Sequence, residues 1–501
     1  MSRAGAYLLL ATLVFAVGCG STPQVTLDQS VKSEELAKAD LSYYWRSAIA
    51  LQPGEKITRI WHLDENVYVL SNTNRVRAFD AAVGQQKWSK VLGNPEQKVF
   101  TPCHTLMATT PTAKPAAGDA SAEQPKPAAG GTSAEQPKPA ITDVVIFNTI
   151  TSALIFERDS GTLLKTIDLA RSGIAANSGG VSDGKLLYLG SIRGWYYGID
   201  LALGFPVWSQ TAGGMISANP VYYAGRLYIA SRSSRDGRGG NLISCKGGMT
   251  AETVWTRKAD DSYVADFAVD DRGVFAGNRD YSVYAYHLTG DPLWTNRFRT
   301  NGPITRAVLA GQSNVYASSD ANRFYAIDLA TGREKWAINA GGTIVMEAKN
   351  QAMVVTDRNE LMVVDAAIGK PLAVVPMTGL TMFVPNTKLS AIFAASNDGL
   401  LVCLRLRAAG HVTPAMLQNS TGTGPAPFQP TTQPSTRAAT QPAETTVTPA
   451  PAPAPAVPPT SAPTPAPAEG AVQPTPAPAP APAVPPSQNE IMVPPAMPFM
   501  Q

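Results

Sequence analysis

Short apolar segments alternate with polar turns along the middle of the chain, and one arrangement returns about every 42 residues. Each copy holds an apolar segment, a polar turn, a second segment ending in Asp or a substitute, a Gly-containing turn and a segment ending in Trp. Alternating β-branched and aromatic residues predict strands, and the Gly punctuation predicts hairpins. Clear copies begin at Val67, Leu186, Val274 and Val315, and weaker ones at Val144, Leu227, Met353 and Ala391.

A further strand precedes each copy, so each repeat supplies four strands, which is typical of a β-propeller blade. We therefore expect an all-β fold, a β-propeller of about eight four-stranded blades, with seven as the alternative. Tryptophan recurs on the predicted outer strand, and we interpret the rings as wedges between neighbouring blades. These wedge residues are Trp45, Trp88, Trp208, Trp255, Trp294 and Trp336.

The two ends of the repeat region predict how the ring closes. The last copy stops after two clear strands and lacks the segment that ends in Trp. Residues 41–50 resemble that missing strand and place Trp45 at the wedge position. We expect this N-terminal strand to complete the last blade, which removes an open sheet edge.

Low-complexity segments set the predicted domain limits, with the propeller over residues 41–407. Residues 107–140 contain the octet SAEQPKPA twice and are poor in large apolar residues, so we expect a disordered surface insert. Residues 408–501 are rich in Pro, Ala and Thr, and we expect a disordered, extended tail.

The N-terminus reads as a secretion signal over residues 1–18, with Arg3 followed by a short apolar run. Cys19 follows this run and Gly18, which resembles the lipobox of bacterial lipoproteins, although Ala16 stands where leucine is usual. The resemblance implies lipidation of Cys19, a tether over residues 19–40 and a periplasmic location. Gly20 favours the outer membrane, and the alternative is a cleaved signal with an incidental cysteine.

Composition excludes several functions. The net charge of +3 argues against a nucleic-acid partner, and the four scattered histidines argue against a metal site. Cys103, Cys245 and Cys403 lie far apart, and we expect no disulfide between them. The acidic stretch from Asp260 to Asp271 could bind a cation, but solvated turns explain it better.

The expected strand order separates two faces of the ring. The insert, the tail and the N-terminal strand all meet the face formed by the turns after the first and third strands. The turns after the second strand lie on the opposite face and repeatedly carry arginine, a residue suited to carboxylate recognition. We hypothesise a partner-binding rim there, and the alternative is solvated turn residues paired with acidic loops. The rim comprises Arg75, Arg193, Trp195, Arg232, Arg235, Arg238, Arg279, Arg323 and Arg358.

The motifs AFDAAVGQQKW and AIDLATGREKW resemble the PQQ-like, or quinoprotein-type, propeller repeat. Two groups of proteins carry it: quinone-dependent dehydrogenases, and BamB-type lipoproteins that assist outer-membrane β-barrel assembly. The chain lacks the adjacent cysteines that such dehydrogenases place against the quinone. The resemblance therefore implies a monomeric, non-catalytic scaffold without cofactor that binds envelope proteins, with the β-barrel assembly machinery as a candidate partner. A PQQ-dependent dehydrogenase and a carbohydrate-binding propeller are the alternatives.

Overall fold

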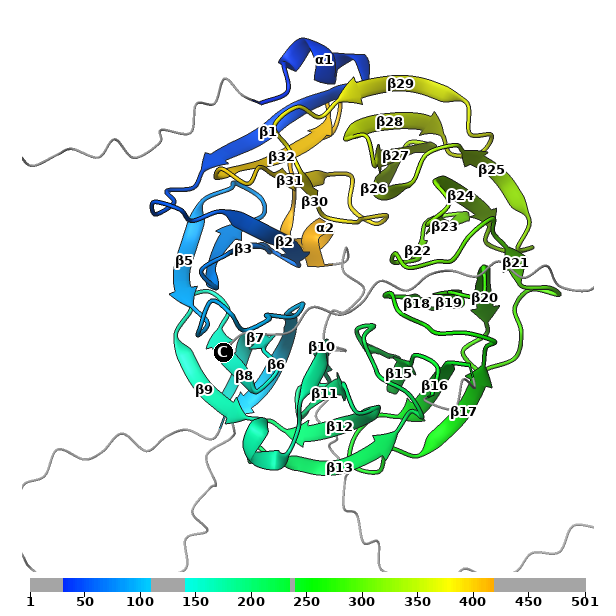
Figure 1. Ribbon diagram of the computed structural model, residues 1–501. Helices are drawn as coiled ribbons and strands as arrows, with labels where there is room; N and C mark the ends of the chain where they lie inside the picture. The colour runs from blue at the N-terminus through cyan, green and yellow to red at the C-terminus, as the bar shows by residue number, and fades with distance from the viewer. Residues whose placement is uncertain (1–29, 110–139, 235–238, 419–501) are drawn as a thin grey trace, which may run out of the picture. The chain divides into compact units, whose positions relative to one another are not determined.

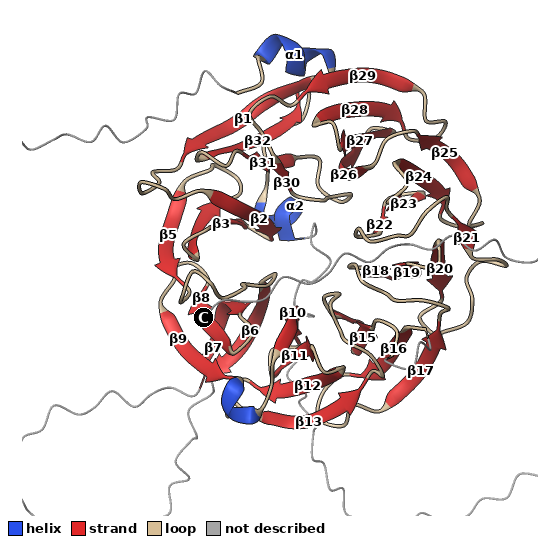
Figure 2. Ribbon diagram, viewed as in Figure 1, coloured by secondary structure: helices blue, strands red, loops and turns tan. Residues whose placement is uncertain are grey.

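The computed structural model describes residues 30–109, 140–234 and 239–418. The predicted signal, Cys19 and most of the insert and tail lie outside these residues. Among the residues described, eight sheets of four antiparallel strands form a ring (Figure 1), which confirms eight blades over seven. The first strand of each blade lies toward the axis and the fourth toward the outside (Figure 2). No helix in these ranges is long and apolar enough to cross a membrane.

Blades 1 to 4 follow one another along the first half of the ring. Blade 1 holds β2 (Ile57–Leu63), β3 (Asn66–Ser71), β4 (Arg75–Asp80) and β5 (Gln86–Val91). Blade 2 holds β6 (Cys103–Thr109), β7 (Ala140–Asn148), β8 (Ser152–Glu157) and β9 (Leu163–Asp168), and the 3-10 helix η2 (Ala170–Ser172) follows. Blade 3 holds β10 (Ala176–Ser182), β11 (Leu186–Ser191), β12 (Trp195–Asp200) and β13 (Pro206–Thr211). Blade 4 holds β14 (Val221–Tyr223), β15 (Arg226–Ala230), β16 (Asn241–Lys246) and β17 (Thr253–Lys258).

Blades 5 to 8 complete the ring. Blade 5 holds β18 (Ala268–Asp270), β19 (Gly273–Asn278), β20 (Ser282–Tyr286) and β21 (Phe298–Arg299). Blade 6 holds β22 (Leu309–Ala310), β23 (Asn314–Ser319), β24 (Arg323–Asp328) and β25 (Glu334–Ile338). Blade 7 holds β26 (Gly342–Ala348), β27 (Gln351–Thr356), β28 (Glu360–Asp365) and β29 (Pro371–Pro376). Blade 8 holds β30 (Met382–Phe383), β31 (Ile392–Ala395), β32 (Leu400–Leu406) and β1 (Leu41–Ala48).

Burial along the strands follows from their place in a blade. The second strands β3, β11 and β23 are buried along their whole length, because neighbouring blades cover both of their faces. Each of these strands accordingly has an apolar run at its start or centre, such as Val67–Leu70 in β3 and Leu186–Leu189 in β11. The outer strand β5 buries only Trp88, since its remaining side chains meet solvent at least in part.

Blade 8 is built from both ends of the folded chain. β1 pairs with β32, from Leu41 opposite Leu406 to Ala48 opposite Leu400. This pairing supplies the fourth strand that the last repeat lacks and confirms the predicted closure. It leaves blade 8 without an open edge between the two ends of the chain.

The folded body starts before the boundary predicted at residue 41, because the helix α1 (Ser33–Lys38) lies within the predicted tether. Its Leu36 is fully buried in a cluster with Val375 of β29 and Leu404 of β32. Figure 1 shows α1 on the outside of the ring, next to β29 and β1. Since the chain ends interrupt blade 8, that blade has no hairpin between its third and fourth strands, and α1 packs against β29 instead.

The folded body also extends past the boundary predicted at residue 407. The chain turns back over blade 8, where the Tyr44 hydroxyl accepts a hydrogen bond from the backbone N–H of Val412. The short helix α2 (Pro414–Gln418) then buries Leu417 against blades 1 and 8. Gln418 donates to Glu65 in the β2–β3 turn at 2.6 Å. Figure 2 shows α2 toward the centre of the ring, beside β2 and β30.

The predicted insert begins and ends inside a strand pair rather than in a loop. β6 and β7 continue pairing as far as Thr109 opposite Ala140. Backbone hydrogen bonding at these positions needs no large apolar side chain, so a composition-based boundary misses them. Residues 110–139 lie outside the described part of the chain.

Six tryptophans, in the outer strands or, for Trp294, just before one, connect a blade to the next along the ring. Each indole N–H donates a hydrogen bond of 2.8–3.0 Å to a backbone carbonyl in the third-to-fourth hairpin of the following blade. The pairs are Trp45 with Ala81, Trp88 with Arg158, Trp208 with Gly248, Trp255 with Leu288, Trp294 with Leu329 and Trp336 with Ala366. Where blade 2 has no such tryptophan, Lys165 donates to the carbonyl of Leu201 at 3.0 Å.

A hairpin glycine accommodates the incoming indole at five of the six tryptophan junctions. Gly84 has φ +72°, and a Cβ placed on it would lie 2.5 Å from the Trp45 ring. Gly369 has φ +70°, and its Cβ would lie 2.4 Å from Trp336. Glycine is therefore required at these positions both for the left-handed backbone and for the close approach of the ring.

Trp45 and Arg46 offer a matched pair of variants on the closing strand. Trp45→Ala removes a buried ring and its bond to blade 1, and should lower the free energy of unfolding by about 3–5 kcal/mol. Arg46 is exposed and only stacks on Tyr43, so Arg46→Ala should cost less than about 1 kcal/mol. Chemical denaturation followed by circular dichroism measures both values, and equal losses would contradict the wedge role.

Candidate functional site

The strand order gives the ring two chemically different faces. The insert face carries the first-to-second turns and third-to-fourth hairpins, including the β6–β7 pair, the start of β1 and the end of β32. The arginine face carries the second-to-third turns and the links between blades. The described part of the chain thus brings both of its ends, and the strand ends that flank residues 110–139, to one face.

The structure places the described members of the predicted rim in second-to-third turns or at the first residue of the strand that follows. They are spread over six blades, so they form a rim rather than one cluster. Arg193, Arg232, Arg279 and Arg358 are exposed, and Arg75 and Arg323 are half-buried. Arg235 and Arg238 lie outside the described residues. Trp195, beside Arg193, is an exposed tryptophan at 43%.

The members of the rim differ in their partners. Arg323 pairs with Glu334 at 3.2 Å and lies over the ring of Tyr325, so its own hairpin holds it. Within the described ranges, Arg193, Arg279 and Arg358 form no ion pair. These three side chains are therefore free to bind an external carboxylate.

The acidic loops that could have neutralised the rim pair with other arginines. Asp260 forms an ion pair with Arg297 at 2.9 Å, and Asp357 binds Arg306 at 2.6 Å. Neither arginine belongs to the predicted rim. The carboxylates of Asp260 and Asp357 are therefore not the partners of the exposed rim arginines.

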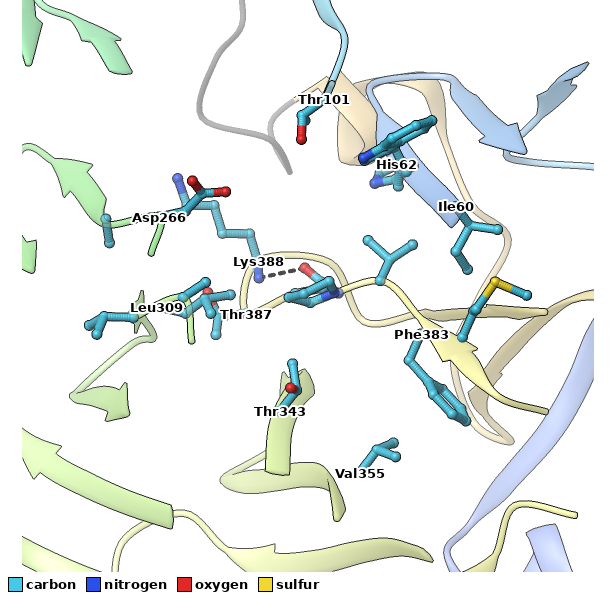
Figure 3. A pocket seen from close by; sticks show the side chains of 18 of the residues that line it. Ile60, His62, Thr101, Asp266, Leu309, Thr343, Val355, Phe383, Thr387 and Lys388 are labelled. Carbon is cyan, nitrogen blue, oxygen red and sulfur yellow. Dashed lines mark hydrogen bonds between the residues drawn. The ribbon is translucent and has the colours of Figure 1, made fainter. Parts of the chain in front are cut away.

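A cavity of about 1070 Å³ runs along the axis of the ring. First strands line it, and Figure 3 shows Ile60, Leu309, Val355 and Phe383 among its apolar walls. Polar side chains such as Thr343 also face it (Figure 3). Sequence reasoning missed this cavity, because its lining residues come one or a few at a time from blades far apart in the chain.

Asn219 fixes the arginine-face end of this cavity by joining four blades. Its side-chain oxygen accepts from the N–H of Gly179 at 2.6 Å, and its side-chain nitrogen donates to Thr101 at 3.2 Å and to Asp266 at 2.7 Å. Its backbone N–H donates to the second oxygen of Asp266 at 2.7 Å. Burial nevertheless raises the pKa of Asp266. These hydrogen bonds form a polar frame at the arginine-face end of the cavity.

An Asp–His–Tyr chain in blades 1 and 2 resembles a catalytic arrangement but has a structural setting. His104 Nδ1 lies 2.8 Å from Asp64, and its Nε2 lies 2.7 Å from the Tyr68 hydroxyl. Tyr68 is fully buried. None of these residues lines the axial cavity or the smaller cavity at its arginine-face end. The chain satisfies buried polar groups between two blades and is closed to a substrate.

No group of three or more His, Cys, Asp or Glu side chains gathers among the described residues. Cys103, Cys245 and Cys403 are buried thiols in three different blades, and burial raises the pKa of each to about 12. The carboxylates that line the axial cavity include Asp266 and Asp357, and both already bind protein donors.

A buried ion pair holds the link that leads from the closing strand into blade 1. Both guanidinium ends of Arg77 donate to the Glu55 carboxylate, at 2.9 and 3.0 Å, and one of them also donates to the carbonyl of Ala50. Burial would raise the pKa of Glu55, but the bonds from Arg77 and from the N–H of Gln52 lower it to about 2. The pair thereby fixes one segment of the arginine face.

Residues 151–371 match the family model described as outer membrane protein assembly factor BamB. Among solved structures, the crystal structure of BamB from Moraxella catarrhalis superposes with a TM-score of 0.51 at 16% identity, covering 74% of this chain and 99% of that one. The computationally designed Ika8 protein gives the same score at 12% identity, covering 72% and 98%. No curated protein matches significantly. The structural likenesses show the fold, and the family model identifies the repeat within it.

The Glu55–Arg77 pair predicts a defined response to acid. The pKa of Glu55 is about 2 in the folded state, against 4.5 for an unperturbed glutamate. The stabilisation that the ionised Glu55 carboxylate gives the fold is therefore complete above pH 4.5 and is lost as the pH falls to about 2. Glu55→Gln should destabilise the protein at pH 7, and the difference from the unmodified chain should shrink across that window.

Denaturant titrations at a series of pH values measure this difference. Glu96→Gln is the matched control, since Glu96 is exposed on the same face and forms no ion pair in the described structure. A difference between Glu55→Gln and the unmodified chain that stays constant from pH 5 to pH 2 would contradict the assignment.

Proposed function

We propose that this PQQ-like repeat propeller is a non-catalytic scaffold that binds protein partners of the bacterial envelope through its arginine face. In this proposal Cys19 carries the lipid anchor at the periplasmic face of the outer membrane. By resemblance to BamB, the scaffold assists the assembly of outer-membrane β-barrels. One observation carries the proposal: exposed arginines without ion pairs repeat around the face opposite the chain ends.

The routing of the chain supports the choice of face. β1 begins and β32 ends at the insert face, and α2 packs there against Glu65. An anchor upstream of β1 therefore holds the insert face near the membrane end of the molecule. The arginine face carries neither chain end and is left for a partner.

The side chains on that face suit an acidic protein surface. Guanidinium groups bind carboxylates through two parallel hydrogen bonds, and arginine and tryptophan are enriched where binding energy concentrates. Arg193 and the exposed Trp195 stand together in blade 3 and combine both properties. The surrounding arginines extend the positive potential and speed association with an acidic partner.

The enzyme alternative predicts a different behaviour. A PQQ-dependent dehydrogenase should reduce a redox dye when the purified chain receives the quinone, Ca²⁺ and an alcohol or sugar. We expect no reduction above background, because the described residues bring together no matching donor set. A carbohydrate-binding propeller would instead retain the protein on an immobilised glycan.

Charge reversal on the two faces tests the proposal. Arg193, Arg279 and Arg358 changed together to Glu should lower partner capture by at least about tenfold, the effect of losing about 1.4 kcal/mol. Lys185, Arg333 and Lys370 changed together to Glu make the same charge change on exposed residues of the insert face. This control should leave capture unchanged.

Capture is measured by crosslinking the tagged chain in its native host and identifying the bound proteins by mass spectrometry. Recovery of the β-barrel assembly machinery with the unmodified chain and the control, but not with the arginine variant, supports the proposal. Equal recovery with both variants, or recovery of no envelope protein, would overturn it.

A further inference from the structure

A second, smaller cavity of about 290 Å³ opens at the arginine-face end of the channel. Arg59 of β2 and Lys98 of the link between blades 1 and 2 line it, together with Asn177, Ser217 and Asn219. The two cavities share Arg59, Thr101, Asp266 and Ala307, so the smaller one is the mouth of the axial channel. The predicted rim surrounds this mouth on the same face.

Internal hydrogen bonds fix the polar floor of the mouth. Asn219 joins Thr101, Gly179 and Asp266, as described above. Asn177 donates to the carbonyl of Ile216 at 2.9 Å. Because these amides already bind protein groups, they hold the shape of the mouth, and a ligand would bind mainly through other side chains.

Three cations converge at the mouth. Lys98 lies over the ring of Phe100 at 4.7 Å, and Arg232 donates to Ser217, which lines the cavity, at 3.2 Å. Partial burial, with the nearby positive charges of Arg59 and Arg232, lowers the pKa of Lys98. None of the three forms an ion pair within the described residues.

The single carboxylate that lines the smaller cavity does not neutralise them. Both oxygens of Asp266 accept hydrogen bonds from Asn219, and burial raises its pKa. Like charges gathered in a concave polar mouth concentrate positive potential there. An anion that enters the mouth would relieve the repulsion between the three cations.

We propose that the channel mouth binds a carboxylate of an acidic peptide segment, held by Lys98, Arg59 and Arg232. The inference rests on the proposed function, because it names the part of the partner that the arginine face recognises. The small volume admits one side chain rather than a folded surface.

The far end of the channel favours entry from the arginine face. α2 buries Leu417 in a cluster with Ile60 and Val384, two residues that also line the axial cavity. Gln418 binds Glu65 at the insert face. α2 therefore occupies space beside the insert-face end, and the arginine-face mouth is left for a ligand.

The test uses the full chain and a fluorescein-labelled hexaglutamate peptide, with fluorescence anisotropy as the readout. Lys98→Glu should weaken peptide binding by at least about tenfold, and Arg59→Gln should weaken it less. Lys90→Glu is the matched control, because Lys90 is an exposed lysine on the outer strand β5. Since Lys98 is also exposed, its variant should keep the thermal melt of the unmodified chain.

Three outcomes decide the inference. Binding of hexaglutamate but not hexalysine, lost in Lys98→Glu and kept in Lys90→Glu, supports it. Equal binding of hexaglutamate by Lys98→Glu and Lys90→Glu overturns it. Displacement of the labelled peptide by inorganic phosphate at the concentration at which unlabelled hexaglutamate displaces it also overturns it. The peptide experiment contains no partner protein, so its result is independent of partner capture. Failure of the peptide to bind, with partner capture retained, would rule out the channel mouth as a carboxylate site and leave the scaffold proposal standing.

Discussion

Ring closure is the constraint on which the rest of this structure depends, because each blade packs its faces against the blades before and after it and the chain has two ends. Pairing of β1 with β32 answers that constraint within one blade. The same junction uses the device found around the ring, since the indole of Trp45 crosses to the Ala81 carbonyl of blade 1 as other tryptophans cross to their next blade. The ring therefore closes through the same kind of contact that joins other blades, but with strands from opposite ends of the folded chain.

The blades could be predicted because each is encoded within one short stretch of sequence. The Trp, the hairpin Gly and the alternating strands follow from contacts repeated at most of the blade junctions. α1 and α2 could not be predicted in the same way. α1 packs against β29 where blade 8 has no hairpin, and α2 carries one buried leucine inside a segment whose composition is that of the tail. Each helix packs at one place in the ring only, so the repeat pattern does not predict it.

The candidate site divides along the same line. Rim positions such as Arg193 and Arg279 follow from counting strands, because a second-to-third turn has a fixed face in a meander. The absence of ion pairs at these positions could not be predicted from the sequence. It depends on Asp260 pairing with Arg297 and Asp357 pairing with Arg306. The channel mouth could not be predicted at all. Arg59, Lys98 and Arg232 come from different blades and meet only when the ring closes.

The distribution of charge over the two faces gives the arginine face its significance. The buried charges of Glu55 and Arg77 compensate each other, because an unpaired buried charge is strongly destabilising. An exposed arginine carries no such penalty, so single unpaired arginines would need no explanation. The channel mouth is different, because it brings three exposed cations together, none of them in an ion pair within the described residues, while Asp266 is already bound by Asn219. A mouth that gathers positive charge in this way is suited to receive negative charge from outside.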